Sequence, residues 1–215
     1  MSIVLYAGSG SPYVWKVWLA LEHKGLPYEL KMLSFSEGDL RKPEFAALSA
    51  RAKVPAITDG AFSLYESGPI CEYLEEKYAG TGPSLLPGSV EQRAIARRIA
   101  AEADAYFQTA AGRLFRLTVQ RTNGDGDPKE IASAKSDLGQ ELDRAERWMP
   151  TGWLAGEISI ADFALYPMLA GVRRMGERTP AHSMVTQIGP RTRAWMARVE
   201  SLPYFDKTYP PHWRA

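Results

Sequence analysis

The sequence contains a single cysteine, Cys71, among its 215 residues. One cysteine cannot form a disulfide within the chain, and such usage is typical of a reducing compartment. The N-terminus, MSIVLYAGSG, lacks the basic residues and the long apolar core of a secretory signal. No apolar run approaches the roughly 20 residues that a membrane-spanning helix needs. We therefore expect a cytoplasmic protein with no membrane partner.

An excess of one charge is also missing. The 26 Lys and Arg residues nearly balance the 25 Asp and Glu residues, which leaves a net charge of +1. This balance gives no electrostatic case for binding nucleic acid, and we expect no such partner. The sequence has no internal repeat and no low-complexity segment. With 45% hydrophobic and 24% charged residues, it has the composition of a globular chain that can bury a sizeable core.

The stretch from Leu5 to Gly25 predicts the end of a strand, a glycine–serine loop and an amphipathic helix. Ser11 is a favoured N-cap, and Pro12 suits the first helical position because its missing N–H costs nothing there. Gly25 is typical of the left-handed residue that ends a helix. The helix carries one apolar stripe at positions i, i+3, i+4 and i+7, namely Val14, Val17, Trp18 and Leu21.

A hydroxyl at the amino end of a helix can hold an anion, because the helix dipole and the first N–H groups favour negative charge there. The loop lacks the G-x-x-x-x-G-K-[ST] pattern of a phosphate-binding loop, since Lys16 falls inside the helix. The anion could therefore be a thiolate that accepts a hydrogen bond from Ser11. The commoner role of such a serine is to cap its helix and nothing more.

The first part of the chain predicts the order βαβαββα, which is thioredoxin-like. A strand at Ile3–Tyr6, the helix and a strand at Tyr28–Leu33 form a parallel unit with a right-handed crossover. A short helix at Pro43–Leu48 follows. Asp59 and Gly60 between two apolar segments predict a hairpin, and Glu66 opens another helix.

After residue 80 the strand signal disappears. Residues 80–89 have the Gly and Pro content of a linker, so we predict domains at 1–79 and 90–215, the second all-helical. Long helices are predicted from Val90 and from Pro128. Ser159-Ile160-Ala161-Asp162 has the form of a capping box before a further helix, and one more helix covers 191–201. The aromatic, proline-rich tail 202–215 is predicted to be extended.

Four motifs in this order resemble those of the cytosolic glutathione transferases. Ser11-Pro12-Tyr13-Val14-Trp15-Lys16-Val17 is similar to the helix entry of the tau class, with the serine spacing of the phi and zeta classes. Val54-Pro55 resembles the family's cis-proline turn, and Glu66-Ser67 resembles its glutathione-binding pair. The segment 159–162 resembles its capping box. The resemblance covers essentially the whole chain and implies glutathione as co-substrate, no metal, and a homodimer.

The resemblance assigns a contact to each part of glutathione. Ser11 would donate a hydrogen bond to the thiolate, with Ser9 as the alternative if the register slips by two. The main chain of Val54 would pair with the cysteinyl backbone by strand addition. Glu66 would accept from the γ-glutamyl ammonium, and Ser67 would bind its carboxylate. The glycyl carboxylate would meet Lys53 as first choice or Arg41 as second.

The resemblance implies a glutathione transferase whose thiolate attacks a small hydrophobic electrophile, with peroxide reduction as a further activity. Tyr13, Tyr106 and Phe107 are candidates for the acceptor-substrate site, which the helical domain would form. The loop contains no cysteine, which argues against the omega-like enzymes that reduce mixed disulfides. Tyr6 falls near the active-site tyrosine of other classes, although a core role at a strand end is the simpler reading.

Two alternatives stay open at this point. A zeta-like cis–trans isomerase of the maleylacetoacetate type would need extra cations in its pocket, for which Arg113 and Arg116 are the candidates. A non-catalytic interaction subunit of the same fold would have no need of Ser11, Glu66 and Ser67. His23, His182 and His212 are expected in surface or helix-end roles.

Overall fold

The computed structural model describes residues 3–214 of the chain. They form two compact units. One contains the residues up to Ser89 together with the segment from Leu202 onward, and the other runs from Val90 to Ser201.

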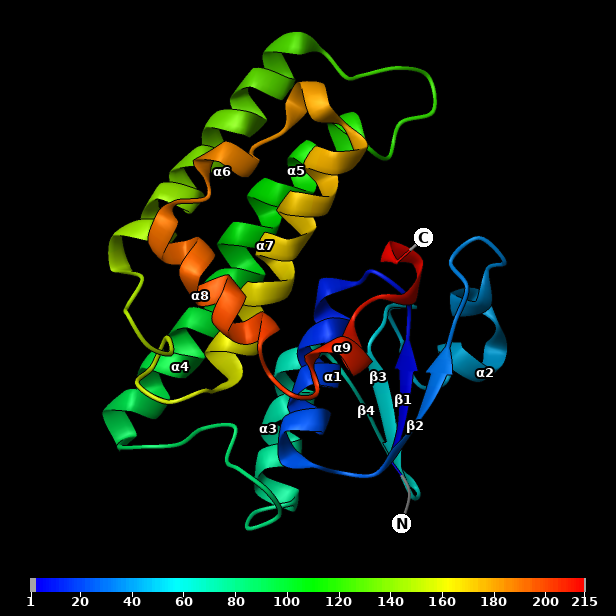
Figure 1. The fold of residues 1–215 in the computed structure, drawn as a ribbon. Coiled ribbons are helices and arrows are strands. Elements are labelled where there is room, and N and C mark those ends of the chain that lie inside the picture. The colour runs from blue at the N-terminus through cyan, green and yellow to red at the C-terminus, as the bar shows by residue number, and fades with distance from the viewer. Residues whose placement is uncertain (1–2, 215) are drawn as a thin grey trace. The chain divides into compact units, whose positions relative to one another are not determined.

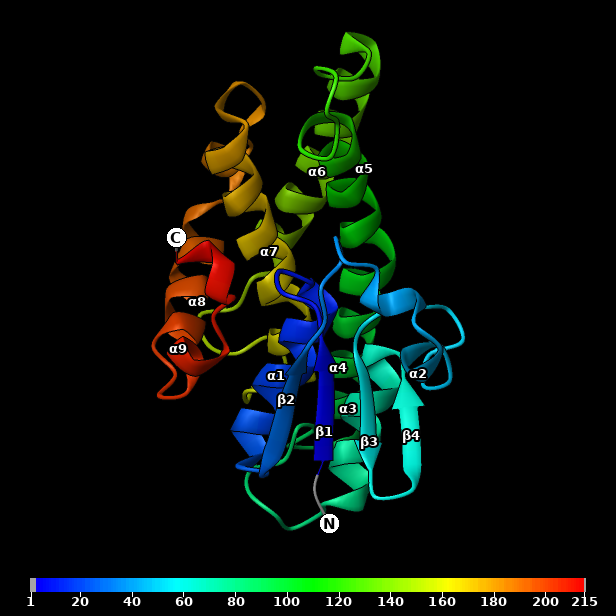
Figure 2. The ribbon, with the colours of Figure 1, turned by 90° about the vertical axis from the view of Figure 1, so that its right-hand side faces the viewer.

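The first unit is a four-stranded mixed sheet with helices on both faces (Figure 1). Its elements are β1 (Ile3–Ala7), α1 (Pro12–Lys24), β2 (Tyr28–Met32), α2 (Pro43–Ala46), β3 (Ala56–Asp59), β4 (Phe62–Tyr65), α3 (Ser67–Lys77) and α9 (Phe205–Thr208). The strand order is β2-β1-β3-β4, as Figure 2 shows, with β1 and β2 parallel and the other pairs antiparallel. The thioredoxin-like order βαβαββα is confirmed.

Local sequence explains this arrangement. Gly60 adopts a left-handed φ of 61° in the tight turn between β3 and β4, so the predicted hairpin is confirmed. In β1, Ile3, Leu5 and Ala7 are buried, as expected for alternate residues facing a core. α1 and α3 cover one face of the sheet and α2 lies on the other (Figure 1).

The second unit is all-helical. Its helices are α4 (Val90–Glu102), α5 (Gln108–Thr118), α6 (Pro128–Trp148), α7 (Ile160–Arg178) and α8 (Pro190–Glu200), with a π-helical stretch at Ala103–Phe107 between α4 and α5. α7 packs with α4, α5 and α8 and is buried along most of its length. The helix predicted from Pro128 is present as α6, with Ile131, Ala134, Leu138, Leu142 and Ala145 buried along one stripe, and the predicted capping box of α7 is present, so both expectations are confirmed.

The C-terminal tail differs from expectation. It was predicted to be extended and assigned to the helical domain, but it forms α9 and a 3₁₀ turn at Pro211–Trp213 and belongs to the first unit. The physical reason is aromatic packing. Phe205, Tyr209 and Trp213 place their ring centroids 5.9, 5.7 and 5.5 Å from that of Trp15 in α1. Rings spaced four residues apart can reach one partner only when the segment turns.

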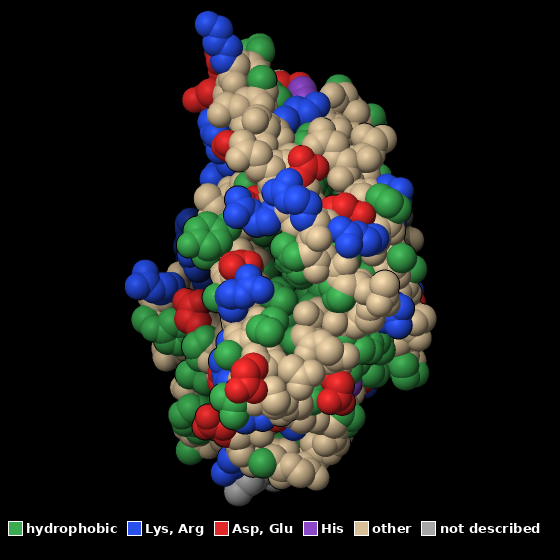
Figure 3. Space-filling model, turned by 90° about the vertical axis from the view of Figure 1, so that its left-hand side faces the viewer, with side chains coloured by type: hydrophobic (Ala, Val, Ile, Leu, Met, Phe, Trp, Pro, Cys, Tyr) green, Lys and Arg blue, Asp and Glu red, His purple; other side chains and the backbone are tan. Residues whose placement is uncertain are grey.

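The surface drawn in Figure 3 carries Lys and Arg side chains interspersed with Asp and Glu side chains. No helix in the described part of the chain has both the length and the apolar character needed to cross a membrane.

Candidate functional site

The strand register brings three predicted motifs to one edge of the sheet. Tyr6 at the end of β1 pairs with Ala56 at the start of β3, and Ala56 pairs with Tyr65 at the end of β4. The segments that continue from these strand ends therefore start side by side. They are the serine loop (Gly8–Ser11), the proline turn (Val54–Pro55) and the pair Glu66–Ser67 at the start of α3.

The serine loop ends at Ser11, the N-cap of α1, whose hydroxyl group is not fully hydrogen-bonded. Ser11 is the N-cap of α1, and its Oγ accepts from the backbone N–H of Val14 at 3.4 Å, a long bond. Within residues 3–214 the structure gives its hydroxyl hydrogen no acceptor. The first turn of α1 carries no acidic residue. The amino end of this helix therefore keeps a donor and the positive end of the dipole for an anion.

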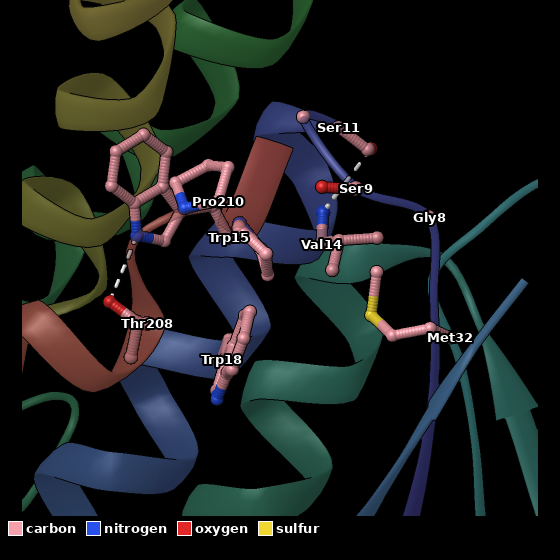
Figure 4. Close-up of a pocket in the computed structure, with 11 residues that line it drawn as sticks. Gly8, Ser9, Ser11, Val14, Trp15, Trp18, Met32, Thr208 and Pro210 are labelled. Atoms are coloured by element: carbon pink, nitrogen blue, oxygen red, sulfur yellow. Dashed lines mark hydrogen bonds between the residues drawn. The ribbon is translucent and has the colours of Figure 1, made fainter. Parts of the chain in front are cut away.

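The second serine of the loop has a different partner. Ser9 Oγ is hydrogen-bonded to Nδ1 of His212 from the C-terminal tail. Figure 4 shows the small pocket that the loop forms with α1 and the tail, with Ser9, Trp15 and Pro210 among its lining residues.

The proline turn lies against the serine loop. The Val54–Pro55 peptide bond is cis, which confirms the expectation from the resemblance. A Cβ built on Gly8 would lie 3.1 Å from Cγ2 of Val54 and 2.4 Å from the exposed ring of Phe35, so a larger residue at this position would require the Phe35 ring to move. The buried hydroxyl of Ser49 accepts from the N–H of Lys53 and donates to its carbonyl, which fixes the chain entering the turn.

The third motif combines a strained backbone with a buried cation. Glu66 has φ 74°, a value that side-chain-bearing residues rarely adopt, and it makes no cap bond to α3 with its side chain. Ser67, the first residue of α3, is 4% exposed, and its Oγ accepts from Nζ of Lys16 at 3.1 Å. Lys16 is itself 1% exposed, and its Nζ lies 5.7 Å from the ring centroid of Tyr13. The start of α3 therefore offers a hydroxyl and a buried ammonium to a carboxylate, and the Glu66 carboxylate to an ammonium.

The remaining predicted residues are less constrained. Lys53 and Arg41 are exposed on the segment that connects β2 and β3. Tyr106 is 65% exposed on the π-helical stretch, whereas Phe107 is 3% exposed and lies in the core of the helical unit. Tyr6 lies 6.1 Å from Phe45 of α2 between ring centroids, which favours its plain structural role.

Sequence reasoning missed two residues at this site, Lys16 and His212. Lys16 lies between Trp15 and Val17 in an otherwise apolar part of α1, and a lysine within a buried stretch was the available signal. His212 is exposed, in line with the expected surface role, but its hydrogen bond to Ser9 was not predicted. The four-residue spacing of the tail aromatics could have indicated that the tail docks on an aromatic partner.

This combination, a thioredoxin-like unit that presents a serine-headed helix beside a cis-proline turn, followed by an all-helical unit, is the architecture of glutathione-dependent transferases. Residues 5–82 match the family model "Glutathione S-transferase, N-terminal domain", and residues 128–198 match "Glutathione S-transferase, C-terminal domain". Glutathione S-transferase 3 of Zea mays is 30% identical over 209 residues, which cover 95% of this chain and 91% of that protein. The chain belongs to the glutathione S-transferase family and is a glutathione S-transferase enzyme.

Solved structures agree with this assignment. A glutathione S-transferase from the Antarctic clam Laternula elliptica matches with a TM-score of 0.84 and 30% identity, covering 100% of this chain and 94% of that one. A glutathione transferase from Pseudomonas putida, solved with one glutathione disulfide per subunit, matches with a TM-score of 0.84 and 28% identity, covering 96% and 90%. Glutathione is thus the co-substrate that the family implies. In residues 3–214, no group of three or more His, Cys, Asp or Glu side chains is arranged to hold a metal ion.

Proposed function

We propose that Ser11 stabilises the thiolate of glutathione for attack on a small hydrophobic electrophile. The observation that carries this proposal is the N-cap geometry of Ser11. Its Oγ accepts one long hydrogen bond, and its hydroxyl hydrogen is left to be donated to a ligand. A free thiol has a pKa near ~8.5, and helix amino ends lower such values by one to several units. Two units correspond to roughly 2.7 kcal/mol in favour of the thiolate. Ser11 is a hydrogen-bond donor in this mechanism, neither nucleophile nor base.

The rest of glutathione would lie along the end of the sheet at which the serine loop, the proline turn and the start of α3 meet. The γ-glutamyl carboxylate fits the start of α3, where the Ser67 hydroxyl and the buried Lys16 ammonium lie 3.1 Å apart. Glu66 would accept from the γ-glutamyl ammonium. The main chain of Val54 would pair with the cysteinyl backbone. The glycyl carboxylate would meet Lys53, with Arg41 as the second candidate.

The test is a pair of Ser→Ala variants. In Ser11→Ala the bound thiol loses a donor, so its pKa rises, and conjugation of an activated aryl halide near pH 6.5 falls roughly 10- to 100-fold. Titration of thiolate absorbance with bound glutathione measures the pKa directly. Ser136→Ala, at an exposed position on α6, is the matched control and should keep both values. Unchanged turnover and an unchanged titration in Ser11→Ala would remove this serine from the mechanism.

Two competing activities lose support from specific contacts. Of the two candidate pocket cations of the isomerase, Arg113 and Arg116, the first is already engaged: its Nη1 lies 2.6 Å from Asp137 and 3.1 Å from the Ser133 hydroxyl, both on α6. The interaction-subunit reading does not explain why Ser11, Ser67 and Lys16 keep their geometry. Peroxide reduction uses the same thiolate and would be lost together with conjugation in Ser11→Ala.

We also propose a homodimer in the cytoplasm. Phe62 on edge strand β4 is 45% exposed and stacks on Tyr73 of α3, so an apolar surface remains for a partner to cover. The expected mass in solution is about twice the 23.9 kDa of one chain. A measured mass of one chain at micromolar concentration would contradict the dimer and leave the thiolate site untouched.

A further inference from the structure

The C-terminal segment, residues 202–214, is anchored on the helix that Ser11 opens. Nε1 of Trp15 donates to Oγ1 of Thr208 at 2.9 Å, and both side chains are buried. The rings of Phe205, Tyr209 and Trp213 pack around Trp15. Trp15 lies one helical turn after Ser11, so the tail is held beside the serine loop (Figure 4).

The serine loop is a tight turn, and the tail contacts its two central residues. The N–H of Ser11 donates to the carbonyl of Gly8 at 3.2 Å, which closes a four-residue turn. Gly10 has φ 80°, the value that a type II turn requires at its third position. A Cβ on Gly10 would lie 2.7 Å from Cε1 of His212, and Ser9 Oγ is bonded to Nδ1 of the same ring. One imidazole therefore contacts both central residues of the turn.

We infer that His212 is a positioning residue for the transferase reaction: through Ser9 and Gly10 it holds the turn that places Ser11 at the amino end of α1. The inference rests on the proposed function, because it takes Ser11 as the thiol contact. It also assigns a role to Ser9. The Ser9 hydroxyl links the turn to His212 of the tail, whereas the Ser11 hydroxyl is the proposed thiol contact, so the two serines have different roles.

The test is a double-mutant cycle on full-length protein, with wild type, Ser9→Ala, His212→Ala and the double variant. Each single variant removes the same hydrogen bond, so we expect each to lower kcat/KM for an aryl halide about three- to tenfold. The double variant should be no slower than the slower single variant. His212→Asn places an amide near the position of Nδ1 and should recover most of the loss. His182→Ala is the matched control, because His182 bonds Asp125 within the helical unit.

Two further readouts separate positioning from general destabilisation. The pKa of bound glutathione should rise in both single variants, and hydrogen exchange of the peptide covering residues 7–14 should become faster. Both should be unchanged in His182→Ala. Normal exchange and a normal thiol titration in His212→Ala, or effects that simply add in the double variant, would overturn the inference.

The same data distinguish this failure from failure of the proposed function. If wild type shows no bound thiolate and Ser11→Ala changes nothing, the proposed role of Ser11 is wrong, and loop exchange in His212→Ala still decides whether the tail holds the turn. If Ser11→Ala loses the thiolate while the His212 variants behave as wild type, Ser11 keeps its role and the positioning role of His212 is wrong.

Discussion

Helices α1 and α7 both begin after a serine, Ser11 in the first unit and Ser159 in the second. Ser159 is fully buried, and its backbone N–H donates to Oδ2 of Asp162 at 2.9 Å while its Oγ accepts from the N–H of Ala161. Ser11 is half-buried, and its cap bond of 3.4 Å is about as long as the 3.3 Å bond of Ser159. The two serines differ in that the Ser159 hydroxyl also donates to Oδ2 of Asp162, whereas the Ser11 hydroxyl has no acceptor among residues 3–214. The same N-cap chemistry is thus closed on itself in one unit and left open in the other.

Asp162 explains why the α7 start is closed. This carboxylate is fully buried, and besides Ser159 it accepts from the N–H of Leu154 at 3.1 Å and from Nε1 of Trp195 at 2.9 Å. The first turn of α1 has no acidic residue to play this part. A buried hydrogen-bond donor without an acceptor destabilises the fold, whereas an exposed donor can bond water until a ligand replaces it. The absence of an acid beside Ser11 is therefore what keeps this helix start available to an anion.

The largest effect on stability should come from removing the Asp162 carboxylate and its hydrogen bonds. Asp162→Ala leaves the N–H groups of Leu154 and Ser159 and the indole of Trp195 buried without an acceptor, and we expect a loss of about 3–5 kcal/mol in the free energy of unfolding. Urea unfolding followed by circular dichroism measures it. A loss below about 1 kcal/mol would mean that the network is not what fixes α7, and the contrast with α1 would fail.

The second prediction compares the effects of Ser159→Ala and Ser11→Ala on stability and on activity. Ser159→Ala should lower the free energy of unfolding by about 1–2 kcal/mol and leave kcat/KM unchanged, whereas Ser11→Ala should cost less than about 0.5 kcal/mol. Its activity falls instead, as proposed above. Unfolding curves and conjugation rates on the same preparations check both halves. Equal stability losses in the two variants would show that Ser11 is an ordinary structural cap.

The two helix starts also show how far sequence reasoning could reach. Ser11 and Ser159 were both found because capping is a local signal within four residues. The cis state of Val54–Pro55 was expected only from the family resemblance, since its neighbours do not dictate it. The contacts of Lys16 and His212 could not be predicted, because they join residues 51 and 203 positions apart and depend on how the tail and α3 pack on α1.

The third prediction uses pH to probe the closed network alone. Burial raises the pKa of Asp162 to about 6, although its donors oppose the rise. A carboxyl whose pKa is higher in the folded than in the unfolded chain adds stability at low pH and loses it as pH rises through 6. The advantage of wild type over Asp162→Asn should therefore grow between pH 6 and pH 4, by at most about 1.4 kcal/mol per unit. An advantage that shrinks on acidification would show that the donors hold the pKa below its ordinary value.

The smallest effect is expected at the other open helix start, that of α3. Lys16→Met keeps the apolar stem in the buried position but removes the ammonium that bonds Ser67, so the site loses a positive charge where we place the γ-glutamyl carboxylate. We expect KM for glutathione to rise about three- to tenfold with kcat nearly constant, because this contact binds ground state and transition state alike. Lys129→Met, at an exposed position on α6, is the control. A fall in kcat at constant KM would instead mean that Lys16 helps to stabilise the thiolate. The starts of α1 and α3 would then both act on the negative charge of the sulfur.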